Sequence, residues 1–466
     1  MKHRDYTKLL ESLAAEYERH SPASSRLNRE ALKSMIDGGS HTVRLIRPFP
    51  PRIVEARGAT VTDEDGHRIL DFWQGHFANI LGHNPPLVTE ALASAFKGGS
   101  GLQSGFTDRL QVETAEILLE RTGAEKARFT TSGSLSTMYA VLMARAFTGR
   151  SLVMKAGGGW HGAQPWGLVG VDFHEEDARS FQHAESRGLP ATIEEDVVIT
   201  RFNDPKMLEE QFAAYGDRIA CFIVEPVIGS AGFLPADPDY LATARRLATR
   251  HGALLVFDEV ISGFRFRAGS VGGLYGVTPD LSTYAKIMGG GMPVAAVAGR
   301  ADVMALAGRS GSVKFSGGTY SCHPASMLAS RTMMRWLSDH EAEIYPALAL
   351  LGEKARRTVE AAFASEGITA RCTGDPNTAV PGSSVGAVFF PYNPRAVFRS
   401  PEETKNPEYT DVELSDRVLQ LALLLEDVHV VHGLGSVSAA HTENDIARLG
   451  NACAGAARKI KRFLEN

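Results

Sequence analysis

The sequence predicts an α/β fold with a mostly parallel central sheet, helices on both faces, and a small α+β domain built from both chain ends. At 466 residues, the chain is longer than a single hydrophobic core usually fills. From about residue 107, short apolar runs alternate with helical periodicities, which is typical of βαβ units. We therefore expect a large domain over 91–335 and a small domain formed by 1–90 and 336–466.

The N-terminal segment is expected to hold two helices and a small antiparallel sheet. Residues 5–20 and 26–36 have helical periodicity, and the second stretch stops at Gly38-Gly39, where glycine readily adopts a positive φ. Residues 52–72 alternate β-forming residues with turn signals such as Asp65-Gly66.

Short apolar runs give the expected strands of the central sheet. They cover residues 152–154, 196–200, 220–224, 253–257 and 294–298. After about residue 335, helix, strand and loop mix again. A strand at 387–390 is ended there by a Pro-rich polar loop at 391–410.

Charge and cysteine content favour small-molecule chemistry. The 49 basic and 54 acidic residues give a formal charge of -5 without a Lys/Arg block, so we expect no nucleic-acid or membrane partner. The apolar run 421–425 is far short of the about 20 residues that span a bilayer. The four cysteines lack zinc-site spacing, so we expect reduced thiols and no metal site. The charged N-terminus lacks the apolar stretch of a signal peptide, which predicts a cytoplasmic location.

The string Thr-Thr-Ser-Gly-Ser at 130–134 lies between an expected strand and a helix that Gly149 closes. Small hydroxyl residues and a glycine at a helix N-terminus expose backbone N–H groups to an anion, and the helix dipole adds to the attraction. Ser132, Gly133 and Ser134 therefore predict a phosphate site. An ordinary helix N-cap satisfies the same string.

A carboxylate, Asp258, directly follows the apolar run 253–257. This position suits a group that holds a proton on a heteroaromatic nitrogen. Helix capping is the alternative, whereas metal binding lacks a nearby His/Cys set.

Lys286 stands between apolar residues and the triple glycine 289–291. Burial would lower its pKa from about 10.4 and leave a neutral amine able to attack an aldehyde. The alternative is a snorkelling lysine before a flexible loop.

The string Gly-Gly-Gly-Trp-His-Gly at 157–162 formally matches a dinucleotide-binding motif. That motif must open a helix, but Pro165 and Gly167 follow here and suit a loop, which disfavours an NAD-dependent dehydrogenase. Trp160 instead offers a ring face to a flat ligand. A plain core tryptophan is the alternative.

One ligand, pyridoxal 5'-phosphate (PLP), fits all four features. It has a phosphate for the anion site, a ring nitrogen for the Asp258 carboxylate, a flat ring for the Trp160 face and an aldehyde for the Lys286 amine. An ordered set of strings accompanies them: 62–72, Leu-Gly-His at 81–83, 129–134, Trp-His-Gly at 160–162, Val-Glu-Pro-Val at 224–227, 258–265, 285–293, Ser-Gly-Gly-Thr-Tyr at 316–320 and 441–446. From about residue 30 to 460, the chain thereby resembles the class III (ω-) aminotransferases of PLP fold type I, the aspartate aminotransferase-like fold. The branch of glutamate-1-semialdehyde 2,1-aminomutase and β-amino-acid aminotransferases is closest.

The resemblance implies roles for the cofactor residues. Lys286 matches the lysine that forms an imine with the cofactor, Asp258 the partner of the pyridine nitrogen, and Trp160 and Val260 the contacts on opposite ring faces. Ser132, Gly133 and Ser134 match the phosphate turn, His161 lies in the matching Trp-His-Gly string, and Glu225 matches a glutamate near the ring substituents. Thr319 matches a threonine that reaches the phosphate of the neighbouring subunit's cofactor. A homodimer with shared active sites is therefore implied.

Substrate residues are less constrained by the resemblance. Arg44 resembles the carboxylate-binding arginine of the aminomutase branch, for which a guanidinium fork is suited. A surface arginine in a loop is the alternative. His432 aligns with a carboxylate-binding arginine of the β-amino-acid aminotransferases and leaves that substrate class open.

The chain departs from the family at three further places. Leu135 replaces a glutamate in the first turn of a helix, and Trp160 replaces the more usual tyrosine. The loop at 391–410 is longer than usual.

The expected reaction is ping-pong transfer of an amino group from an amino acid or amine to a keto acid or aldehyde. In it, Lys286 acts as the general base and Asp258 holds the ring-nitrogen proton. An aminomutase that moves the amino group within one substrate is the alternative.

Overall fold

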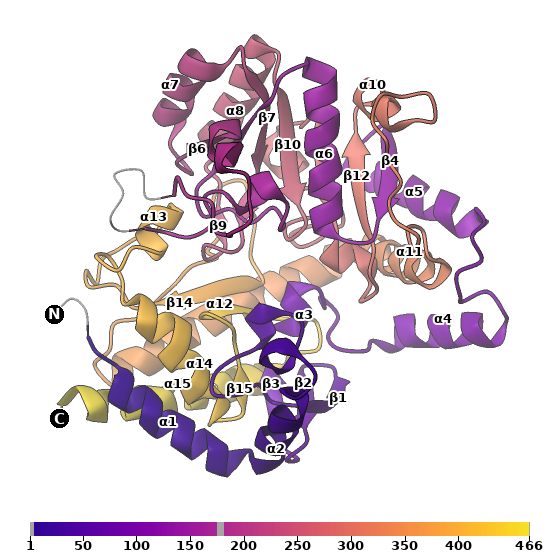
Figure 1. Ribbon diagram of the computed structural model, residues 1–466. Helices are drawn as coiled ribbons and strands as arrows, with labels where there is room; N and C mark the ends of the chain where they lie inside the picture. Colours follow the sequence, from indigo (N-terminus) through magenta and orange to yellow (C-terminus); the bar gives the residue numbers. More distant parts are fainter. Residues whose placement is uncertain (1–3, 175–180, 466) are drawn as a thin grey trace.

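The computed structural model describes residues 4–174 and 181–465. A seven-stranded sheet forms the centre of its large lobe (Figure 1). In spatial order, the strands are β4 (Lys126–Thr130), β12 (Ala295–Gly299), β11 (Leu281–Tyr284), β10 (Leu254–Glu259), β7 (Ile219–Val224), β5 (Leu152–Ala156) and β6 (Val197–Thr200). Only β12 runs antiparallel to its neighbours. The predicted α/β fold with a mostly parallel sheet is confirmed, and the five predicted strands correspond to β5, β6, β7, β10 and β12.

Helices cover both faces of this sheet. The helices are α5 (Arg109–Thr122), α6 (Gly133–Thr148), α7 (Pro205–Tyr215), α8 (Pro238–His251) and α11 (Pro324–Asp339). In β10, Leu254 and Val256 pack with residues of α6, whereas Leu255 and Phe257 pack on the other face with residues of α7 and α8. Because both faces are buried, the first four residues of the strand are all apolar and do not alternate with polar residues.

The small lobe combines both chain ends. Its elements are α1 (Thr7–His20), α2 (Pro22–Ala31), β1 (Ile53–Arg57), β2 (Thr60–Asp63), β3 (Arg68–Asp71), α12 (Glu341–Ser365), β13 (Arg371–Cys372), β14 (Val385–Phe389), α14 (Leu419–Leu424), β15 (Val428–His429), β16 (Leu434–Ser436) and α15 (Glu443–Glu465). The predicted antiparallel sheet is β1-β2-β3, and β15 extends it by pairing parallel with β3. The predicted domain limits, whose first three residues lie outside the described part, stay a prediction.

The second N-terminal helix, α2, spans Pro22–Ala31, so it begins and ends earlier than the predicted 26–36. Pro22 suits the first helical position. In addition, the carboxylate of Asp65 accepts hydrogen bonds from the backbone N–H groups of Ala23 (2.6 Å) and Ser24 (2.8 Å). A side chain about 40 residues away thus caps the helix, and local periodicity does not reveal such a cap.

The prediction that Asp258 lies beyond its strand is wrong. Strand β10 continues through Asp258 and Glu259, which pair with Thr283 and Tyr284 of β11. Strand β11 was missed, because its sequence Leu-Ser-Thr-Tyr is short and half polar.

Across the described residues, no helix combines the length and apolar character needed to cross a bilayer.

Candidate active site

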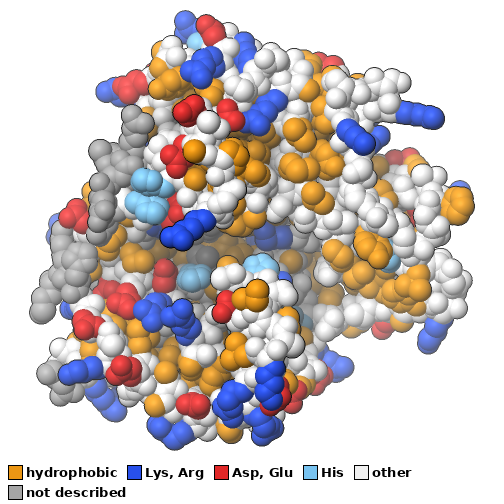
Figure 2. Space-filling model, viewed as in Figure 1, with side chains coloured by type: hydrophobic (Ala, Val, Ile, Leu, Met, Phe, Trp, Pro, Cys, Tyr) orange, Lys and Arg blue, Asp and Glu red, His pale blue; other side chains and the backbone are white. Residues whose placement is uncertain are grey.

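The molecule is hollowed between the two lobes (Figure 2), where the carboxyl ends of the parallel strands point toward the small lobe (Figure 1). An open pocket with a cavity volume of about 260 Å³ lies at these strand ends, close to the lower limit of the roughly 300–1,000 Å³ typical of small-molecule sites. The segments that follow β4, β5, β7, β10 and β11 line it. The sequence-predicted residues that line it are Ser132, Gly133, Ser134, Trp160, His161, Glu225, Asp258, Val260 and Lys286. Ligands of open α/β sheets bind at this edge.

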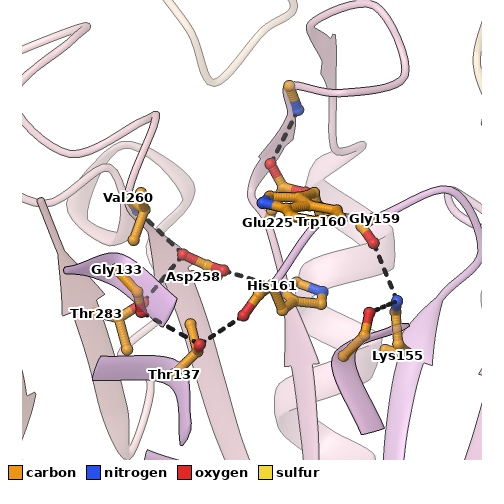
Figure 3. A network of polar contacts seen from close by, with 12 residues as sticks. Gly133, Thr137, Lys155, Gly159, Trp160, His161, Glu225, Asp258, Val260 and Thr283 are labelled. Carbon is orange, nitrogen blue, oxygen red and sulfur yellow. Dashed lines mark hydrogen bonds and ion pairs between the residues drawn. The ribbon is translucent and has the colours of Figure 1, made fainter. Parts of the chain in front are cut away.

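Asp258 is the centre of a hydrogen-bond network (Figure 3). Its Oδ1 accepts bonds from the Thr283 hydroxyl (3.0 Å) and the Val260 N–H (3.1 Å), and its Oδ2 lies 2.8 Å from His161 Nδ1. Only 3% of the residue is exposed. These partners fix the carboxylate in one orientation.

His161 is buried beside Asp258. Burial lowers its pKa, and the hydrogen bond to the Asp258 carboxylate opposes that shift. The Thr137 hydroxyl donates to the carbonyl of His161 at 2.5 Å, and Gln164 Nε2 donates to the same carbonyl at 2.7 Å. The loop after β5 is thereby tied to helix α6.

A buried lysine, Lys155, donates hydrogen bonds to backbone carbonyls of the same loop and of the segment after it. Lys155 Nζ donates to the carbonyls of Gly159 (3.0 Å) and Val169 (2.8 Å), and burial lowers the pKa of Lys155 to about 7. The loop is followed by a 3-10 turn at Pro165–Leu168 and not by an α-helix. The structure therefore lacks the helix that dinucleotide binding at 157–162 requires.

Trp160 lies on the pocket wall and is 43% exposed, so it is not a core tryptophan. Its backbone N–H donates to Glu225 Oε1 at 3.0 Å, and Gly229 N–H donates to Oε2 at 3.0 Å. Burial, followed by the nearby charge of Asp258, raises the pKa of Glu225 to about 7. A carboxyl group with a pKa of about 7 is therefore hydrogen-bonded to the backbone of Trp160.

Lys286 begins a single 3-10 turn, Lys286–Gly289, directly after β11, and its φ is +50°. Burial lowers the pKa of its ammonium group, while the carboxylates of Asp258 and Glu225 oppose the shift. A lowered pKa increases the neutral, nucleophilic fraction of the amine.

The turn before α6 contains the N-cap that its sequence allowed, and the phosphate site predicted there stays a prediction. Ser132 is the N-cap, because its hydroxyl accepts a bond from Leu135 N–H at 3.3 Å. Gly133 and Ser134 line the pocket, and by helix geometry their first-turn N–H groups have no partner within the helix. A Cβ atom at Gly133 would come within 2.9 Å of a Val260 methyl carbon, so only glycine leaves this approach open.

Three predicted residues lie outside the pocket lining. Thr319 is in an exposed segment, where its carbonyl accepts a bond from Gln103 Nε2 at 2.8 Å. Arg44 ends a 3-10 turn, and its Nε bonds to His76 Nε2 at 3.1 Å. His432 is half exposed, and its Nδ1 lies 3.8 Å from the Asp416 carboxylate.

The segment 391–410, predicted as a loop, contains a short helix, α13 (Pro401–Thr404). Lys405 Nζ donates to the carbonyl of Val171 at 2.9 Å, and the Thr404 hydroxyl donates to that of Ala231 at 2.9 Å. These bonds tie the segment to the chain that follows β5 and β7.

Comparison with known proteins identifies the family. Residues 45–357 match the model of the family described as Aminotransferase class-III. The chain belongs to the class III aminotransferases. Its cofactor is PLP.

Relatives and solved structures cover nearly the whole of this class III aminotransferase. A glutamate-1-semialdehyde 2,1-aminomutase of Methanoculleus marisnigri is 34% identical over 92% of this chain and 98% of its own. A β-phenylalanine aminotransferase from Variovorax paradoxus is 30% identical, with a TM-score of 0.83 over 97% of both chains. A transaminase with PLP bound is 30% identical, with a TM-score of 0.82 over 96% of this chain and 99% of its own.

The pocket residues of this aminotransferase fit PLP. The glycine at 133 opens an anion turn, and the fixed carboxylate of Asp258, the ring plate of Trp160 and the amine of Lys286 line the same pocket. Sequence reasoning missed three supporting residues, Thr137, Lys155 and Thr283. A threonine or lysine within a helix or strand carries no local signal of these partners.

Proposed function

We propose that Lys286 and Asp258 are the catalytic residues of this aminotransferase and that its reaction is ping-pong transfer between an amino donor and a carbonyl acceptor. The observation that carries the proposal is the common pocket at the strand ends, which brings a lysine of lowered pKa together with a buried, immobilised carboxylate. Bound PLP supplies an electron sink for a carbanion at the substrate carbon.

Each protein group has a role that follows from its contacts. Lys286 accepts and returns the substrate proton as a neutral amine. Asp258 holds a proton on the cofactor's ring nitrogen through a charge-assisted hydrogen bond, and His161 keeps its carboxylate oriented. The turn at Ser132–Ser134 binds the phosphate, and Trp160, Val260 and Glu225 surround the ring.

The active form is proposed to be a homodimer in which Thr319 reaches the phosphate bound by the partner subunit. Large apolar side chains are exposed around this segment: Leu102 is 74%, Phe106 82% and Tyr320 62% exposed. Leu102 flanks Gln103, whose side chain bonds to Thr319. Exposed apolar patches of this kind mark protein interfaces. The cytoplasmic location stays a prediction.

The substrate side of the pocket is proposed to bind a carboxylate at Arg44. His432 is a weaker candidate, because it is half exposed and faces Asp416. Intramolecular transfer, as in glutamate-1-semialdehyde 2,1-aminomutase, is the second candidate function. The relatives that carry that name at 34–38% identity favour it.

Borohydride reduction followed by peptide mapping tests the lysine. The cofactor should label the peptide that contains Lys286, and Lys286→Ala should lose the label together with about 10²–10⁴-fold of the rate. At saturating cofactor, Lys155→Met, which removes the fully buried lysine near the pocket, is the matched control and should keep the label at Lys286. An undiminished rate in Lys286→Ala, or a label at another lysine, would refute the assignment.

An amine-donor panel with pyruvate or 2-oxoglutarate as acceptor separates the two candidate reactions. Transamination requires an external acceptor, so the amount of product should rise with acceptor concentration. Complete conversion of one amino-carbonyl substrate without any acceptor would establish the aminomutase reaction in its place.

A further inference from the structure

Residues Gln74–Phe77 form a turn wound in the left-handed sense. Their φ angles are +45° at Gln74, +61° at Gly75, +61° at His76 and +64° at Phe77. Glycine adopts such angles freely, but the other three residues are disfavoured in this conformation. Consecutive strained residues persist only where the surroundings hold them, and they concentrate at functional sites.

Two buried side chains hold this left-handed turn. The Asp71 carboxylate accepts the N–H groups of Trp73 and Gln74, both at 2.9 Å, and Gln74 Nε2 donates to the Asp71 carbonyl at 2.8 Å. At the other end, the buried guanidinium of Arg265 donates to the carbonyl of Phe77. The turn is therefore fixed at both ends.

Asp71 is itself held by two histidines. His83 Nε2 lies 2.7 Å from one carboxylate oxygen, and His429 Nδ1, from β15, lies 2.9 Å from the other. These contacts keep the pKa of Asp71 well below its ordinary value despite its burial. The carboxylate of Asp71, which holds the left-handed turn, is thus fixed by one histidine from the N-terminal part of the chain and one from the C-terminal part.

The left-handed turn places His76 near Lys286, outside the pocket lining itself. The turn packs against the segment Lys286–Gly289. The His76 ring lies 4.3 Å from the Trp73 ring and 4.5 Å from the His41 ring, between centroids. Burial, helped by the charges of His41, Arg44, Lys286 and His429, lowers the pKa of His76 to about 3.

A neutral His76 can accept a hydrogen bond, and Nε2 is the acceptor for Arg44 Nε at 3.1 Å. This bond engages Nε of the guanidinium and not its two terminal nitrogens. A guanidinium held in this way presents a fork that matches the two oxygens of a carboxylate.

We propose that His76, carried on the left-handed turn, is a positioning residue that aims Arg44 at the carboxylate of the amino donor. This inference rests on the proposed function, because it assigns the substrate side of the same pocket.

Three small probes test the inference. They are the amino acid 3-aminobutanoate, its carboxylate-free counterpart isopropylamine, and butanoate, whose binding to the holoenzyme is measured by calorimetry without turnover. His76→Phe keeps an aromatic ring but removes the acceptor, whereas His76→Gln retains an acceptor. His340→Phe is the matched control, because the His340 ring also lies close to a tryptophan ring, that of Trp336 at 4.2 Å, but its Nδ1 bonds to the Trp336 carbonyl and not to an arginine.

In His76→Phe, the dissociation constant of butanoate and the Michaelis constant for the amino-acid probe should both rise at least about fivefold. The turnover rate should change less than twofold, so selectivity over isopropylamine falls. His76→Gln should recover most of the loss. Because His76 acts through Arg44, adding His76→Phe to Arg44→Ala should weaken butanoate binding no further.

Equal butanoate affinities in His76→Phe and His340→Phe, or additive effects in the double variant, would overturn the inference. The borohydride label at Lys286 separates this failure from failure of the proposed function. If Lys286 is labelled but His76→Phe binds butanoate with unchanged affinity, only the role of His76 is refuted. If Lys286 is not labelled but His76→Phe binds butanoate more weakly, only the proposed catalysis is refuted. If His76→Phe fails to fold, the butanoate affinity of His76→Gln decides, because binding as weak as that of Arg44→Ala contradicts the acceptor role.

Discussion

Replacing Asp258 with asparagine separates catalysis from stability. The amide oxygen can take the place of Oδ1 and accept the bonds from Thr283 and Val260. The amide nitrogen then faces His161 Nδ1, which can accept if the ring proton moves to Nε2. We therefore expect the free energy of unfolding to change by about 1 kcal/mol or less.

The catalytic loss should be larger, because asparagine carries no charge to hold the proton on the cofactor's ring nitrogen. A charge-assisted hydrogen bond is worth about 1.5–3 kcal/mol. At about 1.36 kcal/mol per factor of ten, the first half-reaction should slow roughly 13- to 160-fold. The rate is measured in a single turnover at saturating cofactor, by the absorbance change that follows addition of the donor.

Glu259→Gln is the matched control for this experiment. Glu259 is the neighbouring buried carboxyl group, but its oxygens accept bonds from Ser270 (2.5 Å) and Val271 (2.7 Å) and do not line the pocket. Its single-turnover rate should stay within threefold of the unmodified enzyme. A rate within threefold in Asp258→Asn would refute the role assigned to Asp258.

Three further predictions concern stability and cofactor binding. In Asp71→Asn, two of the four donors to the carboxylate lose their acceptor, so urea unfolding should show a loss of about 2–6 kcal/mol; a loss below 1 kcal/mol would contradict the network. Burial raises the pKa of Glu259 to about 7 from 4.5, so the folded protein keeps a proton that the unfolded chain releases, and stability should fall as pH rises between these values. This slope is at most about 1.4 kcal/mol per pH unit, and Glu259→Gln should remove it. If plots of unfolding free energy against pH from 5 to 8 are parallel for the two proteins, Glu259 does not cause the slope. Lys155→Met leaves the carbonyls of Gly159, Gly167 and Val169 without this donor, so the dissociation constant of PLP, measured by equilibrium dialysis, should rise about 5- to 30-fold, and an unchanged constant would show that other contacts hold the loop.

Parts of the site could be predicted because their chemistry is local. A helix that begins after Ser132 and ends before Gly149 exposes its N-terminal N–H groups wherever it is placed. Likewise, an apolar strand followed by acidic residues predicts a carboxylate at the edge of the sheet where ligands bind. The predicted strand end at 257 was nevertheless two residues too early, because the end of β10 depends on its pairing with β11.

The sequence by itself determined the fold class, the cofactor and the segments that line its pocket, since periodicity and motif order are properties of neighbouring residues. Only the tertiary structure decided which partners hold those segments. The pairing of Asp258 with Thr283, the cap that Asp65 gives to α2, and the Arg265 bond to Phe77 join residues 25 to 188 positions apart. Such contacts depend on strand register and on the packing of the two chain ends, neither of which a local pattern specifies. The left-handed turn that carries His76 belongs with them, because its backbone is favourable only where Asp71 and Arg265 hold it.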